Sequence, residues 1–289
     1  MTPKSKVASY FELMKPGLSF LVVISAVMGL YLGLERSLPV PLLLHLFAGV
    51  FLAAGGANAL NQWLEGKEDA LMQRTRVRPL PEGRLRPGQV FYFGLVCSVA
   101  GTLYIFFLIN PLTALLSLAS SLSYLFVYTP LKKLTSLCTI AGAVPGAIPI
   151  LMGWAASGRG LNHQAWVLFF IMFLWQFPHF LAIAWLCRED YAKAGFVMLT
   201  AQDPEGQMVG YQIVLYTLAL LAASLISTLV GLTGKFYFFG ALAIGLAFLG
   251  FGISLALARS RSRARRVMFA SIIYLPVLQL LMVLDKALL

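Results

Sequence analysis

Two groups of polar residues interrupt an otherwise apolar sequence. The residue types and spacing of the first group suit the binding of metal ions. Asn61, Glu65 and Asp69 recur every four residues, so a helix would carry all three on one face. On a straight helix this row extends over roughly 12 Å, which is too far for one ion. Either a metal cluster bridges a phosphate-bearing ligand, or the helix ends at Gly66 and Asp69 folds back. The sequence leaves both arrangements open.

Three arginines follow this row at alternate positions, Arg74, Arg76 and Arg78. Guanidinium groups bind phosphate oxygens in pairs, and Mg²⁺ prefers carboxylate and amide oxygens together with substrate phosphates. Residues 58–86, with four acidic and six basic side chains, therefore indicate a Mg²⁺–diphosphate site. The alternative is a mixed-charge loop that only anchors topology. Acids that begin inside an apolar segment favour the functional interpretation.

A second acidic group, Glu189 and Asp190 with Lys193 beside them, ends a later apolar segment. The two groups follow the second and sixth apolar segments, which would run in the same direction, as in a parallel internal repeat. Facing groups of acids repel each other unless cations lie between them. We therefore expect Asp190 to join the first group around divalent metal.

Three further side chains could take part in the chemistry. Tyr128 and Lys132 close the fourth apolar segment, either as an interfacial anchor or as groups that reach the diphosphate or the leaving oxygen. His179 lies inside the sixth segment next to Pro178, which should kink that helix and free a carbonyl group. His179 is either a buried hydrogen-bonding group or a ligand or catalytic residue.

Transmembrane helices must position these residues. The chain has 289 residues, of which 60% are hydrophobic and 11% charged, and this composition excludes a soluble globular protein. Nine apolar segments are long enough to cross a bilayer. They lie near residues 16–34, 41–64, 88–108, 111–129, 137–157, 163–187, 209–232, 236–258 and 266–286. We expect an all-α membrane protein with a single domain over residues 1–289 and no linker.

Positive charge sets the expected orientation. With the N-terminus in the cytoplasm and the C-terminus outside, all but four of the 22 basic residues are cytoplasmic. The four exceptions are Arg36, Arg159, Lys235 and Lys286. The net charge of +11 can then attract anionic lipids or anionic substrates at the inner face, where a loop of five arginines at 259–266 adds a lipid anchor. Nucleic acid is not expected as a partner, because there is no basic soluble domain.

These motifs resemble those of the intramembrane aromatic prenyltransferases, and within them the protoheme IX farnesyltransferases (haem O synthases). The first superfamily motif is matched by Asn61-x₃-Glu65-x₃-Asp69 followed by Arg74-Thr-Arg-Val-Arg78-Pro-Leu, with Glu65 in place of the commoner aspartate. The second motif is reduced to Glu189-Asp190-Tyr-Ala-Lys193. The string Trp175-Gln-Phe-Pro-His179-Phe is similar to the signature of the haem branch.

The resemblance implies a bundle of nine helices around a central cavity, open toward the cytoplasmic face of a bacterial inner membrane. It implies farnesyl diphosphate and protohaem (haem B) as substrates, Mg²⁺ as cofactor, and haem O as a product for terminal oxidases. The expected metal ligands, which are also catalytic, are Asn61, Glu65, Asp69 and Asp190, and Tyr128 is a further catalytic residue. The expected substrate-binding residues are Asn58, Arg74, Arg78, Lys132, Lys193 and His179.

Two other functions are compatible with parts of the pattern. A prenyltransferase of the same superfamily could act on a quinone precursor or a chlorophyllide, although residues 175–180 argue against it. A secondary transporter would also have internal repeats and intramembrane charges. Transport sites lie near the bilayer midplane, however, whereas the acids here gather at one face.

Overall fold

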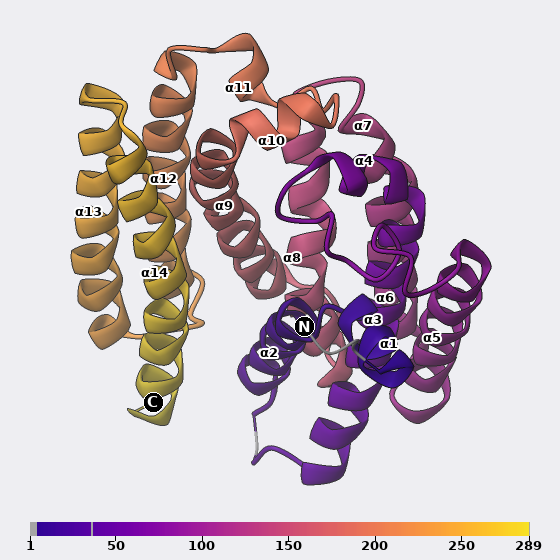
Figure 1. Cartoon of the computed structure of the whole chain (residues 1–289). Helices are drawn as coiled ribbons and strands as arrows, with labels where there is room; N and C mark the ends of the chain where they lie inside the picture. Colours follow the sequence, from indigo (N-terminus) through magenta and orange to yellow (C-terminus); the bar gives the residue numbers. More distant parts are fainter. Residues whose placement is uncertain (1–4, 36, 289) are drawn as a thin grey trace. The chain divides into compact units, whose positions relative to one another are not determined.

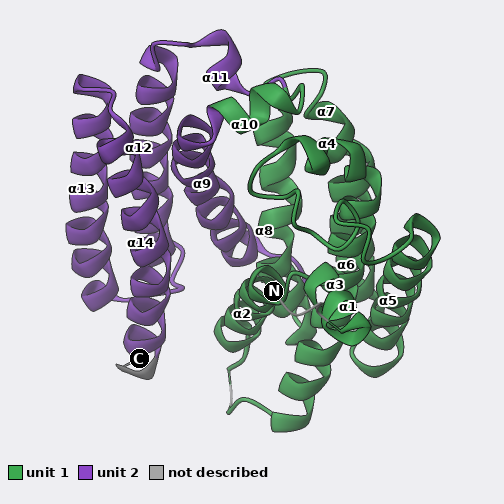
Figure 2. Cartoon of the chain, viewed as in Figure 1, with its two compact units in different colours: residues 1–159, 189–196 green, residues 160–188, 197–289 purple. Residues whose placement is uncertain are grey.

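The described residues of the computed structural model are 5–35 and 37–288, so Arg36 lies outside them. They fall into two compact units (Figure 2). Unit 1 comprises residues 1–159 and 189–196, and unit 2 comprises residues 160–188 and 197–289. Their regular secondary structure is helical throughout (Figure 1). A single domain over residues 1–289 stays a prediction.

Nine helical segments within the described residues are long and apolar enough to cross a membrane, which confirms the predicted multi-pass fold. In unit 1 they are α2 (Pro16–Gly33), α3 (Val40–Leu64), α5 (Pro87–Leu108), the segment Pro111–Leu131 and α8 (Cys138–Ala156). In unit 2 they are α9 (His163–Leu186), α12 (Gln207–Leu229), α13 (Lys235–Leu257) and α14 (Arg261–Leu288).

Prolines and asparagines start several of these helices. Pro16, Pro87 and Pro111 occupy the first turns of α2, α5 and α6 (Pro111–Leu122), where the missing N–H costs nothing. Asn110 and Asn162 precede α6 and α9, and each side chain accepts a hydrogen bond from the third backbone N–H that follows, at 2.8 and 3.1 Å. These caps satisfy donors that a helix start leaves unpaired.

Within unit 1, α8 packs closely because its small residues let neighbours approach. A Cβ added at Gly153 would lie 1.6 Å from the carbonyl oxygen of Ala26 in α2. A Cβ at Gly142 would lie 2.6 Å from the ring of Tyr128. The glycines therefore bring α2 to backbone contact with α8 and leave room for an aromatic side chain of the proposed site.

The second and sixth spans end in the same way. Glu65 after α3 has φ −99° and ψ 16°, and Cys187 after α9 has φ −106° and ψ 15°. Each is followed by a helix of six residues, α4 (Gly66–Leu71) and α10 (Arg188–Lys193). The first span therefore breaks just before Gly66, which was one of the two predicted arrangements, and the similar backbones fit an internal repeat.

Two sequence-based expectations concern unit 2. The arginine run 259–266 is not a loop throughout, because α14 begins at Arg261; we attribute this to good helical propensity of arginine and alanine in 261–266. Helix α9 continues through Pro178 from His163 to Leu186. At the far end of α14, the Asp285 carboxylate accepts hydrogen bonds from the N–H groups of Gly234 and Tyr237 and so caps α13.

Candidate functional site

The loop after α4 folds back onto its acids. The Thr75 hydroxyl donates to the Asp69 carbonyl oxygen at 2.8 Å, which closes the turn. This turn places the Arg78 guanidinium against both carboxylate oxygens of Asp69, with Nη1 2.7 and 2.6 Å away. Asp69 is fully buried, so its charge depends on this pairing. A predicted metal ligand and a predicted phosphate-binding arginine, nine positions apart in the sequence, are therefore in direct contact.

Two more acids of this region, Glu65 and Glu68, bind lysines that follow the fourth span. Lys132 Nζ lies 2.6 Å from Glu65 Oε1, and both residues are buried. Lys133 donates to Glu68. Each buried acid thus faces a basic side chain, and no three His, Cys, Asp or Glu side chains within the described residues form a group that could hold a metal ion. The predicted metal ligands stay a prediction.

The amide of Asn61 is held from two sides. Lys15 Nζ donates to Asn61 Oδ1 at 3.2 Å, and Asn61 Nδ2 donates to Thr129 Oγ1 at 3.1 Å. Thr129 Oγ1 in turn donates to the carbonyl oxygen of Tyr124 at 2.9 Å. Tyr124 belongs to a π-helical segment, η1 (Ser123–Tyr128), between α6 and α7 (Thr129–Leu131). Such π-helical turns frequently occur at functional sites.

The side chains described so far, Lys15, Asn61, Glu65, Asp69, Arg78, Thr129 and Lys132, form a polar cluster. An aromatic pair lies beside its Lys132. Tyr124 and Tyr128 stack with ring centroids 5.7 Å apart and an interplanar angle of 23°. Lys132 Nζ lies 4.4 Å from the Tyr128 ring centroid, within the range of a cation–π contact. The extra residue of the π-helical turn therefore helps to place two tyrosine rings next to the Lys132–Glu65 pair.

The basic and acidic side chains around Asn61 are shielded from water, and this changes their pKa values. Burial raises the pKa of Asp69, and the Arg78 guanidinium opposes that rise. The pKa of Lys15 is lowered to about 7, mainly by burial and then by the charges of Arg78 and Lys132. Glu65 and Asp69 act in the opposite direction on Lys15. Three basic side chains thus share two carboxylates, which favours an additional anion.

The segment that carries Asp190 belongs to the same unit and touches the loop after α4. Gln73 N–H donates to Asp190 Oδ1 at 3.4 Å, and the Arg74 guanidinium lies 4.9 Å from the Tyr191 ring centroid. Lys132 Nζ lies 5.6 Å from the ring of Phe196. Figure 1 shows α4, α7 and α10 at one end of unit 1. The structure thus brings the two predicted acidic segments together.

Other predicted site residues have different surroundings. Lys193 and Arg74 are exposed. Asn58 is buried and donates to Ser19 Oγ at 3.1 Å. In unit 2, the His179 Nδ1 and Ser271 Oγ atoms are 2.8 Å apart, and the His179 ring stacks on Trp175 at 5.1 Å. The substrate-binding roles predicted for these side chains stay predictions.

A surface groove of about 720 Å³ lies elsewhere in unit 1. It is lined by Tyr10, Arg86, Gly88, Gln89, Tyr92, Phe93 and Val96. None of the residues that surround Asn61 lines it. The central cavity expected from the sequence therefore stays a prediction.

Sequence reasoning missed three residues of this cluster, Lys15, Thr129 and Tyr124. In the orientation expected from the sequence, Lys15 is only one of the many basic residues on the cytoplasmic side. Its one sequence signal is its place directly before Pro16-Gly17, where a chain turn was to be expected. For Thr129 and Tyr124 no local signal exists, because their role depends on the π-helical turn and on Asn61, 68 positions from Thr129.

Residues 22–273 match the model of the UbiA prenyltransferase family. This chain belongs to the UbiA prenyltransferase family. Several relatives that match this chain over nearly its full length are protoheme IX farnesyltransferases. The one from Solibacter usitatus is 44% identical over 96% of this chain and 98% of the relative. The one from Opitutus terrae is 42% identical over 99% of this chain and 97% of the relative. The resemblance to the haem branch is confirmed.

Solved structures of UbiA-type proteins have the same fold. A structure of digeranylgeranylglyceryl phosphate synthase superposes with a TM-score of 0.83 at 17% identity, covering 98% of this chain and 99% of that one. A UbiA homologue from Archaeoglobus fulgidus bound to DMAPP and Mg²⁺ gives a TM-score of 0.68 at 12% identity, covering 95% and 99%. The UbiA-like helical membrane fold predicted from the sequence is confirmed.

Proposed function

We propose that this chain transfers the farnesyl group of farnesyl diphosphate to a vinyl group of protohaem (haem B), giving haem O for terminal oxidases. The observation that carries the proposal is the identity of 44% over nearly the full length with a protoheme IX farnesyltransferase. The buried cluster around Asn61 is the part of the chain whose chemistry suits the diphosphate. The reaction takes place in the bilayer, with the N-terminus and the cluster on the cytoplasmic side.

The oxygen donors of the cluster fit Mg²⁺. Asn61, Glu65 and Asp69 offer one amide and two carboxylate groups, all buried, and hard oxygens of this kind are what Mg²⁺ selects. Asp190 lies on the segment that contacts the neighbouring loop. These four residues would hold Mg²⁺, which supplies positive charge to the departing diphosphate. A UbiA homologue of the same fold binds Mg²⁺ together with a prenyl diphosphate, which supports this assignment.

Arg78 and Lys132 would change partners when substrate binds. Both now neutralise carboxylates, at 2.6 to 2.7 Å. If those carboxylates held Mg²⁺, the two cations would be free to donate to diphosphate oxygens, and the exposed Arg74 and Lys193 would add positive charge at the rim. Charge placed in advance around a leaving group in a poorly solvated site is usually the largest catalytic contribution. Ionisation at the allylic carbon is thereby assisted.

Formation of the new carbon–carbon bond needs apolar surroundings that exclude water. The farnesyl tail lies among apolar side chains, where exclusion of water protects the allylic cation from hydrolysis. Tyr128 presents its ring beside Lys132 and can stabilise positive charge through its π face. The carbon–oxygen bond breaks first and its electron pair leaves with pyrophosphate. The vinyl π electrons then form the new bond to the allylic cation. Water then adds to the haem-side cation and loses a proton, and His179 binds the haem iron or a propionate.

The decisive experiment incubates the purified protein with haem B, farnesyl diphosphate and MgCl₂ and measures the mass of the extracted haem. We expect the mass to rise by one farnesyl group plus one hydroxyl group, with release of pyrophosphate that depends on Mg²⁺. A parallel reaction offers 4-hydroxybenzoate. Prenylation of 4-hydroxybenzoate with haem B left unchanged would assign the chain to the quinone branch instead.

A further inference from the structure

The junction between α1 (Lys6–Leu13) and α2 has an unusual backbone. Lys15 has φ +46° and ψ 64°, and among the described residues no other non-glycine residue has a positive φ. A lysine gains nothing locally from this left-handed conformation, because its Cβ crowds the carbonyl oxygen. Strained residues of this kind persist only where the surroundings fix them, and they cluster at functional sites.

Side chains from two helices fix this junction. Gln62 Nε2 donates to the Leu13 carbonyl oxygen at 2.7 Å, and Ser19 Oγ donates to the Met14 carbonyl oxygen at 2.7 Å. Asn58 Nδ2 donates to the same serine oxygen at 3.1 Å. The two carbonyl groups that precede Lys15 are therefore held by buried polar side chains. These hydrogen bonds fix the conformation of the turn at Lys15.

The result of this turn is that the Lys15 ammonium reaches the cluster. Its Nζ atom lies 3.2 Å from Asn61 Oδ1. Arg78 and Lys132 each pair with a carboxylate, whereas no Asp or Glu among the described residues lies within ion-pair distance of Lys15. A half-buried ammonium whose acceptor is a neutral amide lacks the counter-charge that normally accompanies such burial.

We propose that Lys15 is a further diphosphate-binding residue, whose ammonium donates to an oxygen of the diphosphate beside Arg78 and Lys132. The strained α1–α2 turn holds it in place before substrate arrives. Moving Nζ from Asn61 Oδ1 to the diphosphate would also free that amide oxygen, which is one of the proposed Mg²⁺ ligands. The inference rests on the proposed function for the source of the diphosphate, but the affinity for inorganic pyrophosphate tests it separately.

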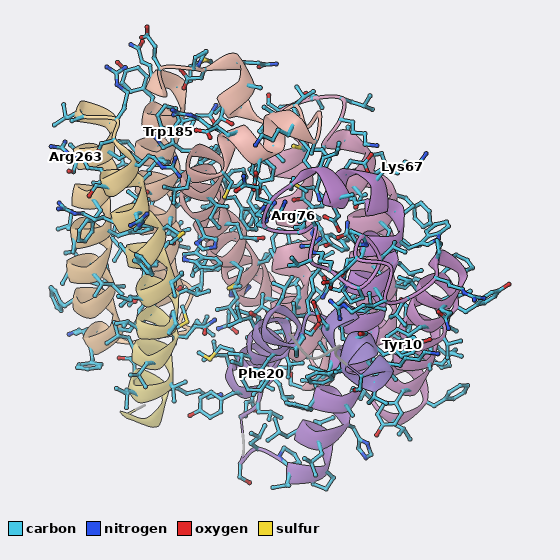
Figure 3. The ribbon with its side chains drawn as sticks, viewed as in Figure 1. Tyr10, Phe20, Lys67, Arg76, Trp185 and Arg263 are labelled. Atoms are coloured by element: carbon cyan, nitrogen blue, oxygen red, sulfur yellow. The ribbon has the colours of Figure 1, made fainter. Side chains whose placement is uncertain are left out.

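The test compares Lys15→Met and Lys15→Arg with Lys67→Met. Lys67 is an exposed lysine of α4 (Figure 3) and serves as the matched control. Titration calorimetry in detergent with MgCl₂ measures the binding of inorganic pyrophosphate. We expect Lys15→Met to weaken this binding on the order of 10- to 100-fold, as for loss of a charge-assisted hydrogen bond. Lys15→Arg should restore most of it, and Lys67→Met should bind as wild type does.

Kinetics separate binding from a purely structural role. In the haem assay, Lys15→Met should raise KM for farnesyl diphosphate by a similar factor and leave KM for haem B unchanged, at a wild-type melting temperature. If Lys15→Met does not fold, Lys15→Gln takes its place, since it keeps a donor for Asn61. Wild-type pyrophosphate affinity in either folded variant overturns the proposal, as does absence of pyrophosphate binding by the wild-type protein. Pyrophosphate binding that depends on Lys15 in a protein that does not modify haem would overturn only the proposed function.

Discussion

The ends of α3 and α9 have nearly the same backbone but different chemistry. Both helices stop at one residue with similar dihedral angles and continue as a helix of six residues. After α3, the acids Glu65, Glu68 and Asp69 are buried and each binds a basic side chain. In α10, no residue is buried.

The aromatic residue at the second end explains part of this difference. Trp185 is buried, with the Arg188 guanidinium 4.5 Å from its ring centroid and Gly206 against its edge. Here an arginine is used for stacking, whereas after α3 an arginine is used to neutralise a carboxylate. The two helix ends thus share a similar backbone geometry, while buried acidic side chains occur at the α3 end and not in α10. We infer that the α3 end carries most of the diphosphate chemistry.

The largest effect that tests this inference is on turnover. Asp69→Ala removes a buried oxygen donor and leaves Arg78 without its partner, so we expect product formation to fall by a factor on the order of 10³ or more. Asp190→Ala removes a half-buried acid and should cost less. Mass analysis of haem after incubation with both substrates measures the two rates.

Detergent melting curves accompany these rates, because a loss of activity counts only for folded protein. Equal losses in the two variants would show that both helix ends contribute alike. Wild-type turnover by folded Asp69→Ala would contradict the assignment of the metal site.

The next effect is on stability. Arg78→Met leaves the fully buried Asp69 carboxylate unpaired, and breaking such a pair costs about 4 kcal/mol. The double variant Arg78→Met with Asp69→Asn removes the uncompensated charge and should regain much of that loss. Thermal unfolding in detergent measures the stability of the single and the double variant. If the single variant melts as wild type does, the pair contributes little and the cluster is better solvated than its burial indicates.

The sequence was sufficient for much of this fold but for less of the site. The spans follow from apolar length, and a break before Gly66 was one of two arrangements that the spacing allowed. The pairing of Lys132 with Glu65 joins residues 67 positions apart, and that of Lys15 with Asn61 joins residues 46 apart. Such contacts depend on helix packing, which periodicity does not encode. The π-helical turn at Tyr124 likewise has no local sequence signature.

A smaller effect concerns the packing around Trp185. Gly206 has φ +73°, and an added Cβ would lie 2.4 Å from the Trp185 ring. Gly158 has φ +84° with nothing within 4 Å, so Gly158→Ala measures the conformational cost alone, about 1 kcal/mol. Gly206→Ala should cost about 2 kcal/mol more, because it also displaces a buried ring. Equal melting temperatures for the two variants would mean that the Trp185 ring moves aside at no cost and does not stabilise the end of α9.

The smallest effect should be confined to one substrate. If the α3 end binds the diphosphate, polar groups of α9 are available for the haem, and His179 lies half-buried well before the end of that helix. His179→Ala should raise KM for haem B about tenfold, equivalent to about 1.4 kcal/mol, with KM for farnesyl diphosphate unchanged. His45→Ala is the matched control. His45 also lies within a span, and its Nδ1 atom is 2.9 Å from one hydroxyl group, that of Tyr104. A change in both KM values, or the same change in His45→Ala, would mean that His179 supports the fold through Ser271 rather than binding haem.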